Sequence, residues 1–207
     1  MDREHTLERC YEVTGEVLRT VFNQQNAQRV TLEGMILKPN MVLSGLTCPK
    51  QEAVHEVADA TVRGLLRTVP AAVPGIAFLS GGQSGELASA RLNAMNVRFK
   101  SRLPWALAFS FARAIQQPAL EIWQGEETHV LAAQQALYYR AKCNRAARRG
   151  EYNAATDKRH EHDKKYPATH ETCGIARTVE YPWSSAHRYS PTFGLAIKVS
   201  RGCIEGI

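Results

Sequence analysis

An apolar segment that ends in a lysine and a proline constrains this chain more than any other feature. Residues 30–42 read VTLEGMILKPNMV, so that Lys38 stands between an apolar run and Pro39. Proline holds the preceding residue extended and cannot donate to a sheet, which predicts Lys38 at the C-terminal end of a strand. Burial disfavours the charged form of lysine, and a neutral amine is a nucleophile for carbonyl carbon in Schiff-base chemistry. The alternative is a strand-end lysine whose ammonium reaches out to water.

Strands and helices are expected to alternate along the chain. Apolar periodicity predicts helices at about 4–25, 50–68, 84–96, up to 123, and 128–149, the third with Ser84 as its N-cap. Short apolar runs at about 75–79 and 104–109 predict two strands after the one that ends at Lys38. This alternation indicates an α/β fold with a parallel sheet. Because the strands lack polar alternation, we expect both faces of the sheet to be buried.

The bulk properties are those of an ordinary globular protein, with 44% hydrophobic and 22% charged residues. No apolar run approaches the ~18 residues of a spanning helix, and the N-terminus does not resemble a signal peptide, so we expect a cytoplasmic chain with no membrane contact. The five cysteines are odd in number and scattered, which predicts reduced thiols. A net charge of +6 suits a phosphorylated substrate as well as nucleic acid.

Each predicted strand ends in polar groups suited to one task. The first strand delivers Lys38, the second Ser80 and Gly81, and the third Ser110 and Arg113. A glycine-rich turn before a helix presents backbone N–H groups to an anion. An arginine can bind phosphate through two parallel hydrogen bonds. Together these residues predict a lysine beside a phosphate-binding site.

The motifs around these residues resemble class I fructose-bisphosphate aldolase. The resemblance rests on LEGMILKPNMV at 32–42, FLSGGQS at 78–84 and FSFAR at 109–113, and also covers RTVPAAV at 67–73 and LNAMN at 92–96. It runs from about residue 2 to 157, with spacing similar to that of the bacterial members of the family. It implies reversible cleavage of fructose 1,6-bisphosphate to dihydroxyacetone phosphate and glyceraldehyde 3-phosphate in glycolysis, with no metal and no cofactor.

The resemblance also implies residue roles. Lys38 matches the lysine that forms a Schiff base with the ketose carbonyl. The residues that match the phosphate site of this sugar substrate are Ser80, Gly81, Ser110, Ala112 and Arg113. Ala112 stands where the family has a glycine whose N–H binds phosphate, and alanine can donate there unless the position needs a positive φ.

The resemblance covers only the C-terminal half of the family pattern. It implies a partial TIM (β/α)8 barrel, with strands six to eight and their helices in residues 1–157. A whole barrel takes ~250 residues, and the acid–base glutamate of the family has no counterpart in this sequence. Full-length members of the family are homo-oligomers. We therefore expect an N-terminally truncated aldolase chain whose activity is weak.

Residues 158–207 resemble no aldolase and are expected to form an irregular basic tail. An alternative interpretation is a catalytically inactive aldolase remnant with a foreign tail. Another is a basic nucleic-acid-binding module, against which the tail's few aromatic residues and low charge density argue. The spacing of His160, His162, His170 and Cys173 also allows a zinc site, which seven scattered histidines easily produce by chance.

Overall fold

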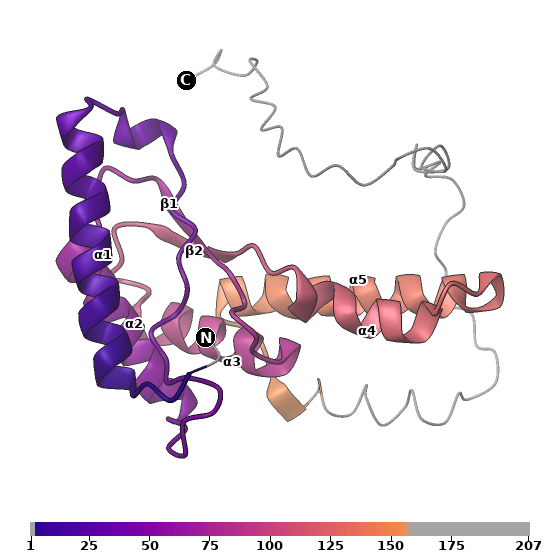
Figure 1. Ribbon diagram of the computed structural model, residues 1–207. Coiled ribbons are helices and arrows are strands. Elements are labelled where there is room, and N and C mark those ends of the chain that lie inside the picture. The colour runs from indigo at the N-terminus through magenta and orange to yellow at the C-terminus, as the bar shows by residue number, and fades with distance from the viewer. Residues whose placement is uncertain (1–2, 156, 158–207) are drawn as a thin grey trace, which may run out of the picture. The chain divides into compact units, whose positions relative to one another are not determined.

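The computed structural model describes residues 3–155 and residue 157. In chain order the elements are α1 (Leu7–Ala27), the 3-10 helix η1 (Leu32–Gly34), α2 (Val54–Thr68), β1 (Gly75–Phe78), α3 (Gly85–Phe99), β2 (Ala106–Phe109), α4 (Arg113–Trp123), the 3-10 helix η2 (Glu127–His129) and α5 (Val130–Arg149) (Figure 1). The five predicted helices are thus confirmed. The predicted tail at 158–207, with the residues of the zinc alternative, lies outside the described residues.

Strands β1 and β2 pair in parallel, with Gly75 opposite Ala106 and Phe78 opposite Phe109. A third extended segment joins β1 on its other side through a single bridge between Leu37 and Ile76. The predicted strand ending at Lys38 is therefore only partly present, because residues 32–34 form a 3-10 turn. Within the described chain this segment has no partner on its outer edge, so nothing extends the ladder. The result is an open parallel sheet of an α/β fold.

Local signals explain where the helices begin and end. The Thr6 hydroxyl accepts a hydrogen bond from the Arg9 N–H at 3.2 Å and caps α1. Ser84 caps α3 as predicted, with its hydroxyl accepting from the Leu87 N–H at 3.2 Å. Helix α5 ends at Gly150, whose φ of 77° is the left-handed conformation typical of a C-terminal glycine.

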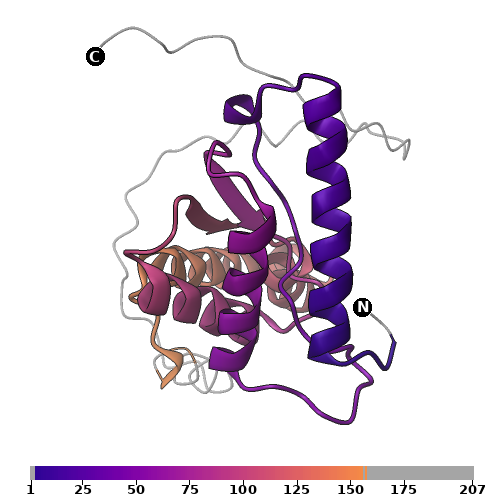
Figure 2. The same cartoon turned by 90° about the vertical axis from the view of Figure 1, so that its left-hand side faces the viewer.

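The helices cover one face of the sheet. Helices α1, α2 and α3 pack side by side, and α5 packs against both α3 and α4 (Figures 1 and 2). Their apolar stripes enclose a core that contains Ile76, Phe78 and Leu107 from the strands. The other face is less covered, since Gly75 and Ala77 are half-buried and Ala106 is exposed. The expectation that both faces are buried is therefore wrong for the described residues.

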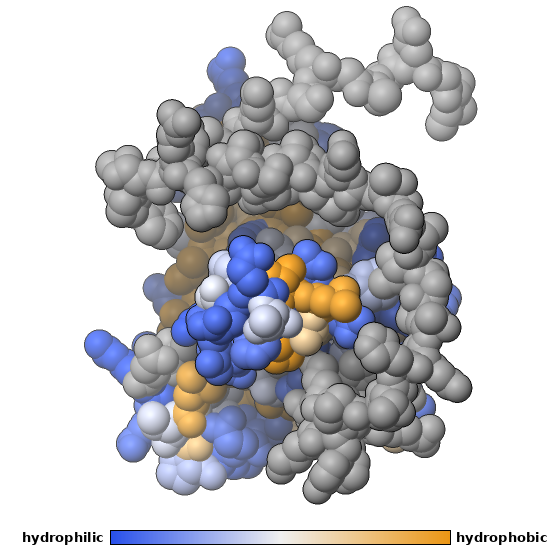
Figure 3. All heavy atoms as spheres, turned by 90° about the vertical axis from the view of Figure 1, so that its right-hand side faces the viewer, coloured by the Kyte–Doolittle hydropathy of each residue, from blue (hydrophilic) through white to orange (hydrophobic). Residues whose placement is uncertain are grey.

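The α4–α5 pair carries exposed apolar side chains beyond the core. Figure 3 looks at these helices from the right-hand side of Figure 1 and shows hydrophobic surface beside hydrophilic surface. Leu120, Trp123 and Leu131 are 52%, 43% and 64% exposed. Among the described helices, none is both long and apolar enough to span a membrane.

The described cysteines are Cys10, Cys48 and Cys143, and all three are free thiols. This agrees with the expectation of reduced thiols for these three positions. Burial is the largest effect on Cys143 and raises the pKa of its thiol. Cys173 and Cys203 lie outside the described residues.

Candidate active site

The predicted site residues follow three neighbouring extended segments at one edge of the sheet. The Leu79 N–H donates to the Pro39 carbonyl at 3.0 Å, and the Ser110 N–H donates to the Phe78 carbonyl at 2.8 Å. These bonds place the chain after Lys38 beside β1, and the end of β1 beside the end of β2. In parallel α/β sheets, the carboxyl ends of the strands are where ligands bind. The structure thus brings together the three segments that the sequence singled out.

Lys38 lies next to the bridge residue Leu37, on the outer segment of the sheet. The Leu37 N–H donates to the Gly75 carbonyl at 3.2 Å, and the Leu37 carbonyl accepts from the Ala77 N–H at 2.9 Å. Strand alternation therefore places Lys38 on the less covered face, together with Ile36, which is 68% exposed. Lys38 is itself exposed, so the expected apolar surroundings are absent from the described chain.

The second segment ends in the glycine turn, Ser80–Gln83. Gly81 and Gly82 have φ angles of 58° and 83°, and the Gln83 N–H donates to the Ser80 carbonyl at 3.1 Å. Positive φ at both central positions favours glycine over every other residue. A side chain at Gly82 would also come within 3.0 Å of the Leu46 side chain. This turn precedes α3 and leaves the backbone N–H groups of its glycines available to an anion.

The third segment ends at the start of α4. Ser110, Ala112 and Arg113 are all exposed, and Arg113 is the first residue of the helix. Ala112 is the N-cap residue and has a φ of −98°, so the position does not need the positive φ that would favour the glycine of the family. The first N–H groups of a helix lack partners within it and favour an anion. Residues 110–113 can therefore contribute backbone donors and a guanidinium.

A buried polar network beneath the glycine turn was missed by the sequence analysis. The Gln83 amide Nε2 donates to the Ser80 carbonyl at 2.9 Å and to the Met41 sulfur at 3.7 Å, and Gln83 Oε1 accepts from the Arg91 guanidinium at 2.8 Å. Arg91 is only 3% exposed. It lies among the buried positions of α3, between Ala88 and Leu92. A charged residue at a core position of a helical pattern was the signal that could have found it.

A second buried cluster ties the end of the described chain to α5. Arg140 Nη1 donates to both carboxylate oxygens of Asp157 at 2.7 Å, and Tyr152 donates its hydroxyl to the same carboxylate. Burial alone would lower the pKa of Arg140, but the hydrogen bonds and charge of Asp157 outweigh it and raise that pKa. Burial and the neighbouring carboxylate also raise the pKa of the Tyr152 phenol.

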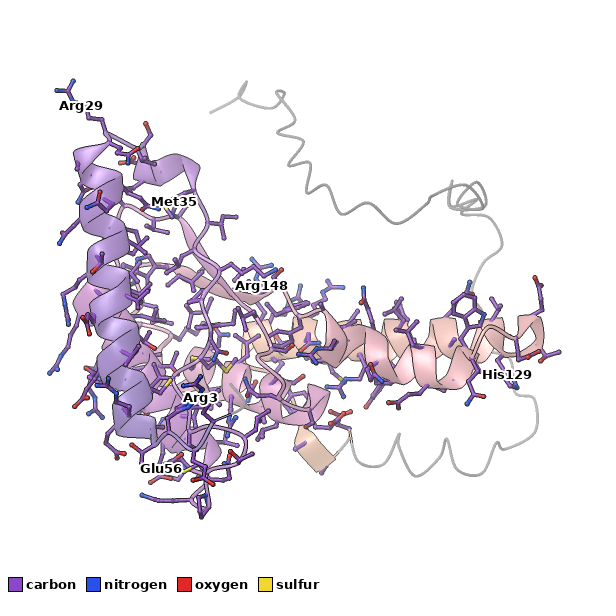
Figure 4. All side chains as sticks on the ribbon, in the orientation of Figure 1. Arg3, Arg29, Met35, Glu56, His129 and Arg148 are labelled. Carbon is purple, nitrogen blue, oxygen red and sulfur yellow. The ribbon has the colours of Figure 1, made fainter. Side chains whose placement is uncertain are left out.

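A pocket of about 490 Å³ lies at the opposite end of β2 from Ser110. Lys100, Arg148 and Glu151 are among the residues that line it, beside Ala106, and Figure 4 shows Arg148 at the end of α5. It is separate from the candidate site, because Ala106 begins the strand and Ser110 follows its last residue. In residues 3–155 and 157, no group of three or more His, Cys, Asp or Glu side chains is placed to hold a metal ion.

Comparison with known proteins points to one family. The family described as "Fructose-bisphosphate aldolase class-I" matches residues 1–172. Fructose-bisphosphate aldolase B of Gallus gallus is 54% identical over 153 residues, which are 73% of this chain and 41% of that protein. The cytoplasmic isozyme 2 of Pisum sativum is 48% identical over 157 residues, covering 76% of this chain and 43% of the relative.

The fold agrees with the same comparison. A crystal structure of fructose-bisphosphate aldolase from Plasmodium falciparum, in complex with TRAP and a small-molecule inhibitor, matches with a TM-score of 0.70 at 45% identity. The match covers 73% of this chain and 43% of that chain. The described residues therefore form part of an aldolase-type TIM barrel, and the chain spans less than half the length of these relatives.

Proposed function

This chain belongs to the class I fructose-bisphosphate aldolase family, and we propose that it carries the Schiff-base lysine and the substrate-phosphate site of an aldolase. The observation that supports this most is the meeting of the three motif segments at one sheet edge, through the bonds from Leu79 to Pro39 and from Ser110 to Phe78. A lysine, a glycine turn and a helix N-terminus with an arginine are the groups that a phosphorylated ketose requires.

In the proposed reaction of a complete enzyme, of which the chain as given is proposed to carry out only the first step, the Lys38 amine attacks the C2 carbonyl of fructose 1,6-bisphosphate and water leaves, which gives an iminium ion. The iminium accepts the electron pair of the C3–C4 bond when that bond breaks. The C4 hydroxyl gives up its proton to a base, and glyceraldehyde 3-phosphate departs. Protonation at C3 and hydrolysis of the iminium then release dihydroxyacetone phosphate and the free amine.

The C1 phosphate of the ketose is assigned to groups on the two segments that follow the one carrying Lys38. The glycine turn supplies the N–H groups of Gly81 and its neighbour, with the hydroxyl of Ser80 beside them. The α4 start supplies the Ala112 N–H and the Arg113 guanidinium, next to Ser110. The C2 carbonyl and the neighbouring C1 phosphate are thus held by different segments of one sheet edge, and such positioning of reacting groups lowers the barrier to reaction.

We limit the proposal to binding and iminium formation for the chain as given, because it spans about 41% of the length of the Gallus gallus relative. The acid–base glutamate that the family resemblance implies has no counterpart in the sequence. A general acid or base typically contributes 10²–10⁴-fold to a rate. Cytoplasmic glycolytic use and homo-oligomerisation belong to the same proposal, as properties of the complete aldolases it resembles.

Trapping with borohydride tests the assignment. The 207-residue chain is incubated with dihydroxyacetone phosphate and sodium borohydride, and the modified peptide is identified by mass spectrometry. Hydride reduces the iminium to a stable secondary amine, so we expect the adduct at Lys38. Exposed lysines such as Lys100 and Lys142 serve as internal controls. An adduct on those lysines with Lys38 unmodified would contradict the proposal.

A further inference from the structure

We propose that Arg91 is a positioning residue for the phosphate site, which acts through Gln83 on the glycine turn and adds a buried positive charge beneath the bound anion. The inference rests on the proposed function. Arg91 lies within α3, which begins at Gly85 directly after the turn, and it bonds to Gln83 rather than to any group assigned to the substrate. The observations that carry it are hydrogen bonds, burial and charge.

The hydrogen bonds show how Arg91 can act on the turn. A guanidinium only donates, so its 2.8 Å bond fixes the oxygen of the Gln83 amide toward Arg91. The amide nitrogen must then face the other way, toward the Ser80 carbonyl and the Met41 sulfur. Gln83 therefore links the glycine turn to the segment that carries Lys38, three residues before Met41. Without Arg91, the amide loses the bond that sets its orientation.

The charge of Arg91 is poorly compensated within the described chain. Its Nε has no hydrogen-bond partner there. Glu52 interacts with the Arg91 guanidinium only through its charge, and the two form no ion pair among the described residues. The Glu52 carboxylate instead accepts a hydrogen bond from the Ser44 hydroxyl at 2.7 Å. Burial lowers the pKa of Arg91 and Glu52 opposes that change, but a guanidinium stays protonated at neutral pH. A bound phosphate would supply the missing negative charge.

The burial of Arg91 and Gln83 separates a structural role from a role in anion binding. The neighbours of Arg91 on the buried side of α3 include Ala88, Leu92 and Met95, each 0% exposed. Because Gln83 is also buried, an apolar replacement of Arg91 alone leaves the Gln83 amide oxygen without its donor and should lower stability. A purely structural role predicts this loss of stability with wild-type phosphate affinity in the folded variant, whereas a role in anion binding predicts that phosphate affinity falls as well.

Three variants of the full chain test this, with inorganic phosphate as the probe. Arg91→Met removes charge and donor at similar length, Arg91→Lys keeps the charge, and Gln83→Leu breaks the link from the other side. Arg98→Met is the matched control on the same helix, since Arg98 is exposed and pairs with Asp59 away from the turn. Phosphate binding is followed by NMR through the backbone N–H signals of Gly81 and Gly82. The stability of the turn is followed by hydrogen exchange of the Gln83 backbone N–H, which donates to the Ser80 carbonyl.

We expect Arg91→Met to bind phosphate about tenfold more weakly, as for one unit charge at an intermediate effective dielectric constant. Its Gln83 backbone N–H should exchange faster, and its unfolding midpoint should fall because the buried Gln83 oxygen loses its donor. Arg91→Lys should show weaker binding than the wild type but stronger binding than Arg91→Met, and should also exchange faster at Gln83. Gln83→Leu should bind more weakly than the wild type, and Arg98→Met should bind phosphate like the wild type.

Wild-type phosphate affinity in folded Arg91→Met would overturn the inference. If Arg91→Met fails to fold, the same result in Arg91→Lys overturns it. If phosphate leaves the Gly81 and Gly82 signals of the wild type unchanged, the proposed phosphate site is wrong. The positioning role then fails together with the site it would serve, whereas a wild-type phosphate response that Arg91→Met retains in full refutes the positioning role alone.

Discussion

Removing the Asp157 carboxylate should lower the free energy of unfolding far more than removing a partly exposed carboxylate that also pairs with an arginine. Arg140 is 3% exposed, and Asp157→Ala takes away its bonds of 2.7 Å to both carboxylate oxygens. Breaking a buried ion pair from one side costs about 3–5 kcal/mol. Glu86 remains 3.2 Å from Arg140 and is 36% exposed, so we expect the lower end, about 3 kcal/mol. The Tyr152 hydroxyl loses its acceptor at the same time.

Urea unfolding followed by circular dichroism measures this loss, and thermal unfolding checks it. For a chain of this size, about 3 kcal/mol corresponds to a fall of about 6–12 °C in Tm. Asp59→Ala is the matched control, because Asp59 also binds an arginine through two bonds, of 2.9 and 2.8 Å, but with both side chains partly exposed. Exposed pairs are worth about 0–1 kcal/mol. Equal losses in the two variants would refute the reasoning from burial.

Three further outcomes follow from the site and its surroundings. Arg113→Ala should weaken phosphate binding by up to about 1.5–3 kcal/mol in calorimetry, and Arg113→Lys should weaken it less, because lysine keeps the charge and loses only the paired donors. Equal phosphate affinities of wild type and Arg113→Ala would exclude Arg113 from the phosphate site. Burial raises the pKa of the Cys143 thiol in the folded chain, so the unfolded chain releases that proton at a lower pH. The free energy of unfolding should therefore fall as pH rises above about 8.5, and it should fall less steeply in Cys143→Ala. The purified chain should cleave fructose 1,6-bisphosphate at least about 100-fold more slowly than a whole class I aldolase in a coupled assay, and comparable turnover would show that a group of this chain acts as the base.

The helices could be predicted from sequence because their signals are local. Ser84 caps α3 through its own hydroxyl, and α5 ends at Arg149, where the periodicity predicts its end, directly before Gly150. The sequence pattern predicts the end of α3 at about residue 96, whereas in the structure the helix continues to Phe99. Helix ends depend on weaker preferences than helix starts with a side-chain cap, so this error is of the expected kind.

The first strand and the burial of Lys38 could not be predicted in the same way. Both depend on which segments cover the sheet, and apolar residues such as Ile36 look the same in sequence whether a neighbour covers them or not. The Arg91–Gln83 bond was missed for another reason. It depends on the rotation of α3 relative to the glycine turn, which packing of the core decides and which no spacing within either segment encodes.

The two halves of the candidate site differ in what supports them, and this bears on their chemistry. The glycine turn rests on a buried network in which Gln83 is held by Arg91 from below and bonds to Ser80 above. Lys38 stands on an exposed segment that is held to the sheet by the bonds of Leu37 and Pro39. Binding of a phosphate needs only the turn and its donors, whereas carbon–carbon cleavage at the iminium also needs a group that acts as a base. We therefore expect phosphate affinity to survive changes in this chain that abolish reaction at Lys38, since the binding half is built from contacts internal to the described fold.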